Sequence, residues 1–181
     1  MNRRGALICL CGIGLASLSR GSLSKTNLSS VSIKQHEVAM RAAIAMGVQN
    51  PRYPFGAVIT NGNSGAILAQ GVNQTSQNPV LHGEMVCIND YVSRQGNKNW
   101  GDCVLYATGE PCPMCMSALV WAGIGGVVYG SSAAAIKKSG IDIFSFGAKE
   151  INRGSGFSQT QLLGGILESE CDALFMNRQR S

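Results

Sequence analysis

The sequence Glu110-Pro111-Cys112-Pro113-Met114-Cys115, taken together with His82-Gly83-Glu84, organises the rest of this chain. Two cysteines three residues apart at the start of a helix can direct both sulfur atoms toward one metal ion. A histidine upstream can supply a third ligand. Three protein ligands leave a fourth position open, which is typical of a catalytic zinc site, whereas a structural site is normally closed by a fourth side chain.

The acidic residue beside the histidine gives this motif its chemistry. Glu84 lies two residues after His82, where a helix is expected to begin. This spacing places the carboxylate near the open metal position without making it a ligand, so that it can move protons for an activated water. The joint pattern of His-x-Glu and Pro-Cys-x-x-Cys is the signature of zinc-dependent base deaminases.

Two other interpretations of the motif remain open. A lone C-x-x-C is weak evidence, because structural zinc sites and redox pairs also contain it. A zinc-stapled binding module would use the same ligands without turnover, although the sequence offers no obvious fourth ligand. A thioredoxin-like redox pair would not need the His-x-Glu sequence.

The length and composition fit one domain preceded by a leader. The chain has 181 residues, of which 45% are apolar, enough to build a core, and only 14% are charged. We expect a leader at residues 1–31 and one zinc-binding domain at residues 32–181.

The expected leader has the layout of an export signal. Arg3 and Arg4 precede an apolar run at residues 5–18, a serine-rich stretch follows, and the first 36 residues contain no acid. The apolar run is shorter than the roughly 20 residues that span a membrane, so no stable membrane span is expected. The adjacent arginines match a twin-arginine signal in part. We expect an exported, periplasmic protein, with organelle import or an uncleaved cytoplasmic tail as alternatives.

The basic charge of the whole chain comes mostly from this leader. Four basic residues lie in it, so the body has 11 basic and 10 acidic residues, and its net charge is +1 rather than +5. The overall charge is therefore not a nucleic-acid signature, and tRNA is not expected as a partner.

The seven cysteines fall into three groups. Two of them, Cys9 and Cys11, lie in the leader, and two are the expected metal ligands. The other three have apolar neighbours, which predicts buried core residues and no disulfide in the body: Cys87, Cys103 and Cys171.

Hydrophobic periodicity predicts an opening helix, a hairpin, and then alternating strands and helices. Helices are expected at residues 33–46, 83–93, 113–122, 133–138 and 167–178, and strands at 54–59, 66–72, 103–108, 126–130 and 160–163. Residues 142–157 are expected to be irregular, Glu84 to face inward, and His36 to lie on a helix surface. This order predicts an α/β protein with a three-layer α/β/α sandwich.

The chain resembles the cytidine deaminase-like superfamily over roughly residues 32–178. Beyond the metal motifs, three stretches are similar to the branch that contains guanine deaminases and tRNA adenosine deaminases: Pro54-Phe55-Gly56-Ala57-Val58, Gly71-Val72-Asn73 and Gly165-Ile166-Leu167-Glu168-Ser169-Glu170-Cys171. The resemblance implies a mixed five-stranded sheet, one Zn2+ per subunit and a homodimer. It also implies that Asn73, Asp142 and Phe55 contact the substrate. Gly83 stands where alanine is commoner, which we expect to leave the backbone looser.

The segment at residues 131–142 looks more like the guanine deaminases than the Asp-x-Lys-x-Gly-type stretch usual in the tRNA enzymes. The resemblance therefore implies hydrolytic deamination of a guanine-like purine base or nucleoside, with release of ammonia. A tRNA adenosine deaminase and an inactive zinc-stapled module remain the alternatives. In the expected mechanism, His82, Cys112 and Cys115 hold the metal, and Glu84 transfers protons.

Overall fold

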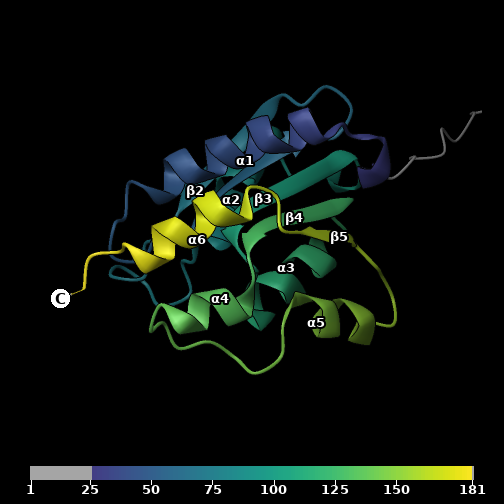
Figure 1. Ribbon diagram of the computed structural model, residues 1–181. Helices are drawn as coiled ribbons and strands as arrows, with labels where there is room; N and C mark the ends of the chain where they lie inside the picture. Colours follow the sequence, from purple (N-terminus) through teal and green to yellow (C-terminus); the bar gives the residue numbers. More distant parts are fainter. Residues whose placement is uncertain (1–25, 181) are drawn as a thin grey trace, which may run out of the picture.

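A computed structural model describes residues 26–180, which form one sheet between two layers of helices (Figure 1). The strands are β1 (Gly56–Asn61), β2 (Ile67–Val72), β3 (Cys103–Gly109), β4 (Gly126–Ser131) and β5 (Gln161–Gly164). The α-helices are α1 (Ile33–Gly47), α2 (Gly83–Gln95), α3 (Pro113–Ala122), α4 (Ala133–Lys138), α5 (Ala148–Gly154) and α6 (Glu168–Met176). Two 3-10 helices, η1 (Leu28–Ser30) and η2 (Trp100–Asp102), complete the described part. None of the helices between residues 26 and 180 has the length and hydrophobicity needed to cross a membrane.

The sheet has the order β2-β1-β3-β4-β5. The β1–β2 and β1–β3 pairs are antiparallel, whereas β3, β4 and β5 run parallel to one another. The expected opening hairpin and the mixed five-stranded sheet are therefore confirmed. Because β3 and β4 are parallel neighbours, the loops that follow them emerge side by side at one edge of the sheet, where α/β proteins usually place their ligands.

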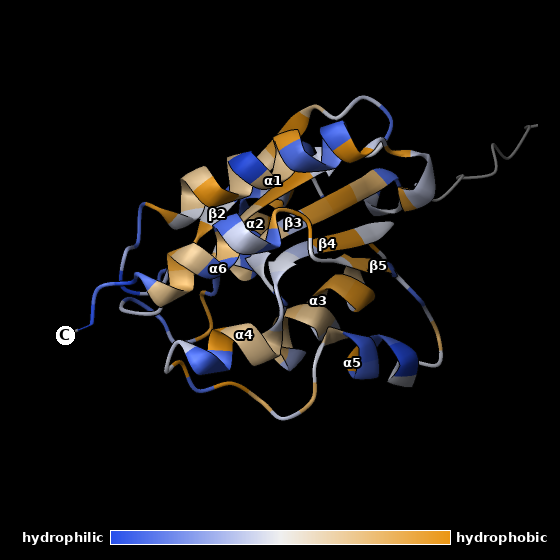
Figure 2. Ribbon diagram, in the orientation of Figure 1, coloured by the Kyte–Doolittle hydropathy of each residue, from blue (hydrophilic) through white to orange (hydrophobic). Residues whose placement is uncertain are grey.

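Alternation along the strands divides the apolar residues between two cores. On β3, Leu105 faces the layer of α2, α3 and α5, whereas Val104 and Tyr106 face α1 and α6. All seven residues of β3 are buried, which explains why its sequence is nearly continuous in apolar residues. Figure 2 shows this apolar centre in orange and the mainly hydrophilic α5 in blue at the outside.

The beginning of α1 is capped as its sequence predicts. The Ser32 side chain accepts the Gln35 backbone N–H, and the Gln35 side chain accepts the Ser32 backbone N–H. Such a reciprocal capping box satisfies two amides that have no partner inside the helix, and loss of the cap residue typically costs about 1 kcal/mol.

His36 was expected on the surface of α1, but only 3% of it is exposed. Its Nε2 lies 3.3 Å from the Leu28 carbonyl oxygen, and its Nδ1 lies 2.9 Å from the Tyr106 hydroxyl. Because a carbonyl can only accept, Nε2–H donates to Leu28 and Nδ1 accepts from Tyr106. The prediction was wrong because η1 folds over this face of α1, a contact that helical periodicity does not reveal.

Part of the segment assigned to the leader belongs to the folded body. The Thr26 amide donates to the Gly101 carbonyl at 2.9 Å, and the Leu28 amide donates to Gln161 Oε1 at 3.0 Å. Leu28 is buried against the core below α1. Residues 26–31 therefore contact the folded body, while the boundary expected between residues 31 and 32 stays a prediction. The other leader predictions, including Cys9, Cys11 and the export signal, fall on residues 1–25, outside the described part.

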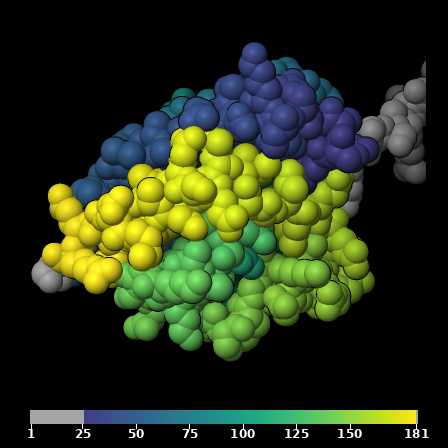
Figure 3. Space-filling view, viewed as in Figure 1, coloured from purple at the N-terminus to yellow at the C-terminus, as the bar shows by residue number. Residues whose placement is uncertain are grey.

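The last helix, α6, covers the same face of the sheet as α1. Figure 3 shows the yellow α6 lying between the blue α1 region and the green α4 region. Cys171, on the inner face of α6, is buried in the core. The exposed Arg41–Glu170 ion pair joins α6 to α1 at 2.6 Å and is worth at most about 1 kcal/mol. The interval expected to be irregular, residues 142–157, contains α5, so that expectation was wrong for Ala148–Gly154.

Candidate metal centre and substrate cavity

Two helix beginnings bring the expected metal ligands together. His82 is the N-cap residue of α2, and Cys112 is the N-cap residue of α3, with Cys115 in the first turn of α3. The ligand atoms of these three residues lie within 4.8 Å of one another. Helix N-termini carry partial positive charge, which favours thiolate sulfurs at both cysteine positions.

The spacing of the ligand atoms fits a tetrahedral zinc ion. The two sulfur atoms are 3.6 Å apart, and the Cys112 sulfur is 3.5 Å from His82 Nδ1. Zn–S bonds of about 2.3 Å and a Zn–N bond of about 2.0 Å at tetrahedral angles require an S···S separation of about 3.8 Å and an S···N separation of about 3.5 Å. The geometry therefore identifies Nδ1 as the coordinating nitrogen, a detail that the sequence could not supply.

The short distances between the three ligand side chains shift their pKa values. The contact with the Cys115 sulfur, supported by His82, lowers the pKa of the Cys112 thiol to about 4, although burial acts in the opposite direction. The same contact raises the pKa of the Cys115 thiol, and the hydrogen bond with Cys112 raises the pKa of His82. The arrangement therefore favours a thiolate at Cys112 beside the histidine, and a bound divalent cation would displace the proton of the second thiol.

Glu84 is buried beside the metal ligands, as expected from its helical position. Only 3% of it is exposed, and burial raises the pKa of its carboxyl to about 7, with a smaller contribution from Cys112. Its Oε2 is buried and has no hydrogen-bond partner among the described residues. An unpaired buried carboxylate oxygen is costly unless another group donates to it. A water held at the open position of the metal would be such a donor, so the residues present fit zinc.

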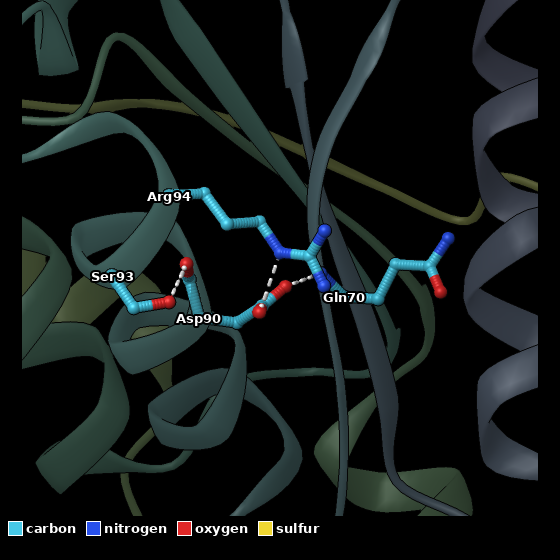
Figure 4. Close-up of polar contacts among 4 residues, drawn as sticks. All are labelled: Gln70, Asp90, Ser93 and Arg94. Carbon is cyan, nitrogen blue, oxygen red and sulfur yellow. Dashed lines mark hydrogen bonds and ion pairs between the residues drawn. The ribbon is translucent and has the colours of Figure 1, made fainter.

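The start of α2 is held tightly, and this corrects the expectation for Gly83. A Cβ atom on Gly83 would lie 2.4 Å from the Phe55 carbonyl oxygen, so glycine allows α2 to approach β1 closely instead of loosening the backbone. Farther along α2, the Asp90 carboxylate accepts a hydrogen bond from the backbone N–H of Gln70 at 2.9 Å and another from the Arg94 Nε–H at 2.7 Å (Figure 4). This contact fixes α2 against β2, and it occupies an amide of an edge strand that could otherwise pair with another chain.

A cavity of about 230 Å³ opens beside the metal centre. His82, Glu84 and Cys112 form part of its floor, and the loop between α4 and α5 forms part of its wall. The three residues expected to contact substrate all line this cavity: Phe55, Asn73 and Asp142. The structure therefore brings every residue predicted for the site into one place, while the roles of the three substrate residues stay predictions.

Asn73 follows β2 and is both a turn residue and a cavity residue. Its Oδ1 accepts the Thr75 amide at 3.1 Å and the Thr75 hydroxyl at 2.8 Å. These bonds fix which end of the amide is oxygen, so its NH₂ group is the one available to a ligand. Phe55 packs against Phe175 of α6 with ring centroids 4.9 Å apart, so α6 sets the position of this aromatic wall.

Several residues of the cavity wall were not predicted from the sequence. These are chiefly Tyr53, Thr75, Glu110, Phe144 and Phe146. Phe144 and Phe146 are 61% and 45% exposed, and their rings are in tilted contact with centroids 5.7 Å apart. Repeated apolar residues inside a segment expected to be irregular were the available signal for them, because apolar residues that cluster at a surface often mark a ligand-binding groove or an interface.

Comparison with known proteins agrees with this geometry. Residues 33–131, more than half of the chain, match the family described as "Cytidine and deoxycytidylate deaminase zinc-binding region". The chain is 36% identical over 124 residues to a guanine deaminase of Bacillus subtilis (strain 168), covering 65% of this chain and 78% of that protein. It is 28% identical over 143 residues to a tRNA-specific adenosine deaminase of the same strain, covering 77% and 86%.

A solved guanine deaminase structure from Nitrosomonas europaea has the same fold, with a TM-score of 0.67 over 81% of this chain and 85% of that one. Its sequence identity is 19%, so it supports the architecture alone. The expected α/β fold of the cytidine deaminase-like type and its zinc chemistry are therefore confirmed. The chain belongs to the cytidine and deoxycytidylate deaminase family of zinc-binding enzymes.

Proposed function

We propose that this protein is a hydrolase that removes the exocyclic amino group of a free, guanine-like purine. The observation that carries the proposal is the pairing, in one cavity, of Glu84 at the metal centre with a second carboxylate at Asp142. A carboxylate only accepts hydrogen bonds, which matches the N–H edge of guanine. The Asn73 NH₂ group can donate to an acceptor elsewhere on the same ring.

The charge and size of the cavity support a small substrate without phosphate. Its charged lining consists of Glu84, Glu110 and Asp142 beside His82, and within residues 26–180 neither lysine nor arginine lines it. These acids would repel a phosphate group. Cavities that bind drug-sized ligands measure about 300–1,000 Å³, so a volume of about 230 Å³ favours a free base over a nucleoside.

The reaction follows from the positions of these groups. His82, Cys112 and Cys115 would hold the zinc, which when bound lowers the pKa of a water molecule to about 7. Glu84 accepts the proton of the attacking water and donates it to a ring nitrogen next to the amine-bearing carbon. Glu84 then takes the remaining proton from the hydroxyl group added at that carbon and passes it to the amino group, which leaves as ammonia while the carbon becomes a carbonyl. The apolar wall, including Phe55, excludes bulk water from this exchange.

A tRNA adenosine deaminase is the alternative function, and one observation favours it. The guanidinium groups of Arg52 and Arg178 lie 5.6 and 5.9 Å from the ring centroid of Tyr53, which lines the cavity. Basic groups at a cavity rim can contact the phosphates that flank a nucleotide. The similarity to a tRNA-specific enzyme of Bacillus subtilis supports this alternative as well.

Ammonia release from a panel of substrates distinguishes the two functions. Purified protein is incubated separately with guanine, guanosine, adenosine, cytosine, cytidine and a tRNA anticodon hairpin. We expect guanine to give the highest kcat/KM and the hairpin to give no inosine. Inosine in the hairpin together with no ammonia from any free purine would overturn the proposed substrate in favour of tRNA.

We also propose that the enzyme acts as a homodimer through an exposed aromatic pair. Trp121 at the end of α3 is 76% exposed and stacks on Phe157, which is 60% exposed, with ring centroids 4.7 Å apart. A large exposed aromatic pair of this kind is typical of an interface. We expect Trp121→Glu to shift the protein from dimer to monomer in sedimentation velocity. Val38→Glu, at another exposed apolar position on α1, should stay dimeric, and a monomeric wild type would refute the proposal.

A further inference from the structure

The outer wall of the cavity is a loop whose middle carries no fully buried side chain. Residues 139–147 connect α4 to α5 and contribute Asp142, Phe144 and Phe146 to the cavity. These three side chains are exposed, and Ile141 and Ile143 beside them are only half-buried, so packing in the core holds the middle of the loop weakly. Its position must therefore come from its two ends and from the helices that carry them.

One carboxylate bridges the helices at both ends of this loop. Glu110 Oε2 accepts the Ala133 amide at 2.9 Å, and Glu110 Oε1 accepts the Ala148 amide at 3.0 Å. Ala133 is the first residue of α4 and Ala148 is the first residue of α5. Each amide is one that has no partner inside its own helix, so a single side chain satisfies both.

The fit around this carboxylate is close. A Cβ atom on Gly147 would lie 2.2 Å from Glu110 Oε1, so only glycine lets the end of the loop approach the carboxylate this closely. The Gly147 amide in turn donates to Glu150 Oε2 at 3.0 Å. The end of the loop at α5 is therefore fixed by two carboxylates, one from the metal loop and one from α5 itself.

Glu110 also belongs to the metal loop. It lies two residues before Cys112, and its own amide donates to the Ser131 carbonyl at the end of β4 at 2.8 Å. One residue thus joins the segment that holds the metal to both helices that carry the cavity wall. None of these contacts requires Glu110 to touch a metal or to transfer a proton.

We propose that Glu110 is a positioning residue, which holds the 139–147 loop at the metal centre through the Ala133 and Ala148 amides and thereby sets substrate affinity. The kinetic consequence rests on the proposed guanine deaminase function. The structural consequence, a loop tied to the metal segment, does not depend on that function.

The test replaces the carboxylate by an amide of the same shape. Glu110→Gln keeps one oxygen and places an NH₂ group against the other backbone N–H, so only one helix start can remain bonded. We expect KM for guanine to rise roughly tenfold while kcat changes less than about twofold, the pattern of lost ground-state binding. Zinc content should stay at one per chain. Glu170→Gln, which removes an exposed carboxylate from α6 on the far side of the sheet from α5, should leave both constants unchanged.

Amide hydrogen exchange gives a readout that is independent of turnover. In Glu110→Gln, exchange should accelerate at residues 139–150 and stay unchanged in β3 and β4, which serve as internal references. If the wild type deaminates no free base, the proposed function fails, while the exchange result still decides the role of Glu110. Unchanged exchange together with unchanged KM would refute that role, and so would loss of zinc, which would make Glu110 a support of the metal loop.

A second variant tests whether Glu110 affects KM through the two backbone amides that it binds. Ala133→Pro removes one of the two bonded amides at the first position of a helix, where proline is tolerated. If Glu110 acts through these amides, Glu110→Gln should raise KM less in the Ala133→Pro background than in the wild type. An equal rise in both backgrounds would show that Glu110 acts by another route, and the proposal would be wrong.

Discussion

Replacing Glu84 by glutamine is expected to lower kcat about 10³- to 10⁴-fold while leaving zinc bound. General acid–base groups usually contribute about 10²- to 10⁴-fold, and Glu84 serves several proton transfers, so the upper end is expected. The side chain keeps its shape in this variant. Glutamine also removes the free-energy cost of burying a charged carboxylate whose Oε2 has no hydrogen-bond partner. The fold and the thermal unfolding temperature should therefore be kept.

Three measurements make this experiment decisive: steady-state kinetics with guanine, elemental analysis for zinc, and thermal unfolding. Glu170→Gln is the matched control, since it removes an exposed carboxylate without touching the cavity. A Glu84→Gln protein that loses its zinc would show that Glu84 is a ligand, and the mechanism above would be wrong. A variant with nearly full activity would assign the proton transfers to another residue.

The parts of the site that are local in sequence could be predicted, and those that depend on distant contacts could not. His82, Glu84, Cys112 and Cys115 form two short motifs, and in each motif the spacing at the start of a helix brings two side chains to the same helix end. The cavity wall lacks such a signal. Ala148 meets Glu110 from 38 residues away, because α5 packs against α3 in the core.

The difference between local and distant contacts also explains the errors in the predicted fold. α5 has seven residues, a length at which helices are marginal in water, and its first amides depend on Glu110 and Glu150. Ala148 and Ile151 then pack it into the core with α3. His36 was misplaced for a similar reason, since the η1 segment that covers it precedes α1 and has no periodicity of its own. Tertiary contacts decided both cases against the local pattern.

The longer elements were predicted well because two independent signals agreed in each of them. The β1–β2 hairpin combines apolar alternation with the turn chemistry of residues 61–65, where the Asn61 side chain accepts the amides of Asn63 and Ser64. α3 combines Pro113 at its first position with Gly123 in the left-handed region at its end. In both elements the local signal and the burial pattern favour the same structure.

The largest effect of all is expected from Cys112→Ser, which should reduce bound zinc well below one per chain and abolish deamination. The Cys112 sulfur is the centre of the ligand set, because it lies 3.6 Å from the Cys115 sulfur and 3.5 Å from His82 Nδ1. A serine hydroxyl at neutral pH is not ionised and is a poor ligand for zinc compared with a thiolate.

The loss of zinc should also be visible in stability, because an ion that binds only the folded state stabilises it by mass action. A chelator should lower the unfolding temperature of the wild type and leave that of Cys112→Ser unchanged. Cys103→Ser is the matched control: its sulfur is buried away from the metal, 3.4 Å from the Asn99 carbonyl, which a serine hydroxyl can also reach. This control should keep one zinc per chain. Full zinc occupancy in Cys112→Ser would overturn the ligand assignment, since the remaining His82 and Cys115 would then suffice to hold the ion without the sulfur that joins them.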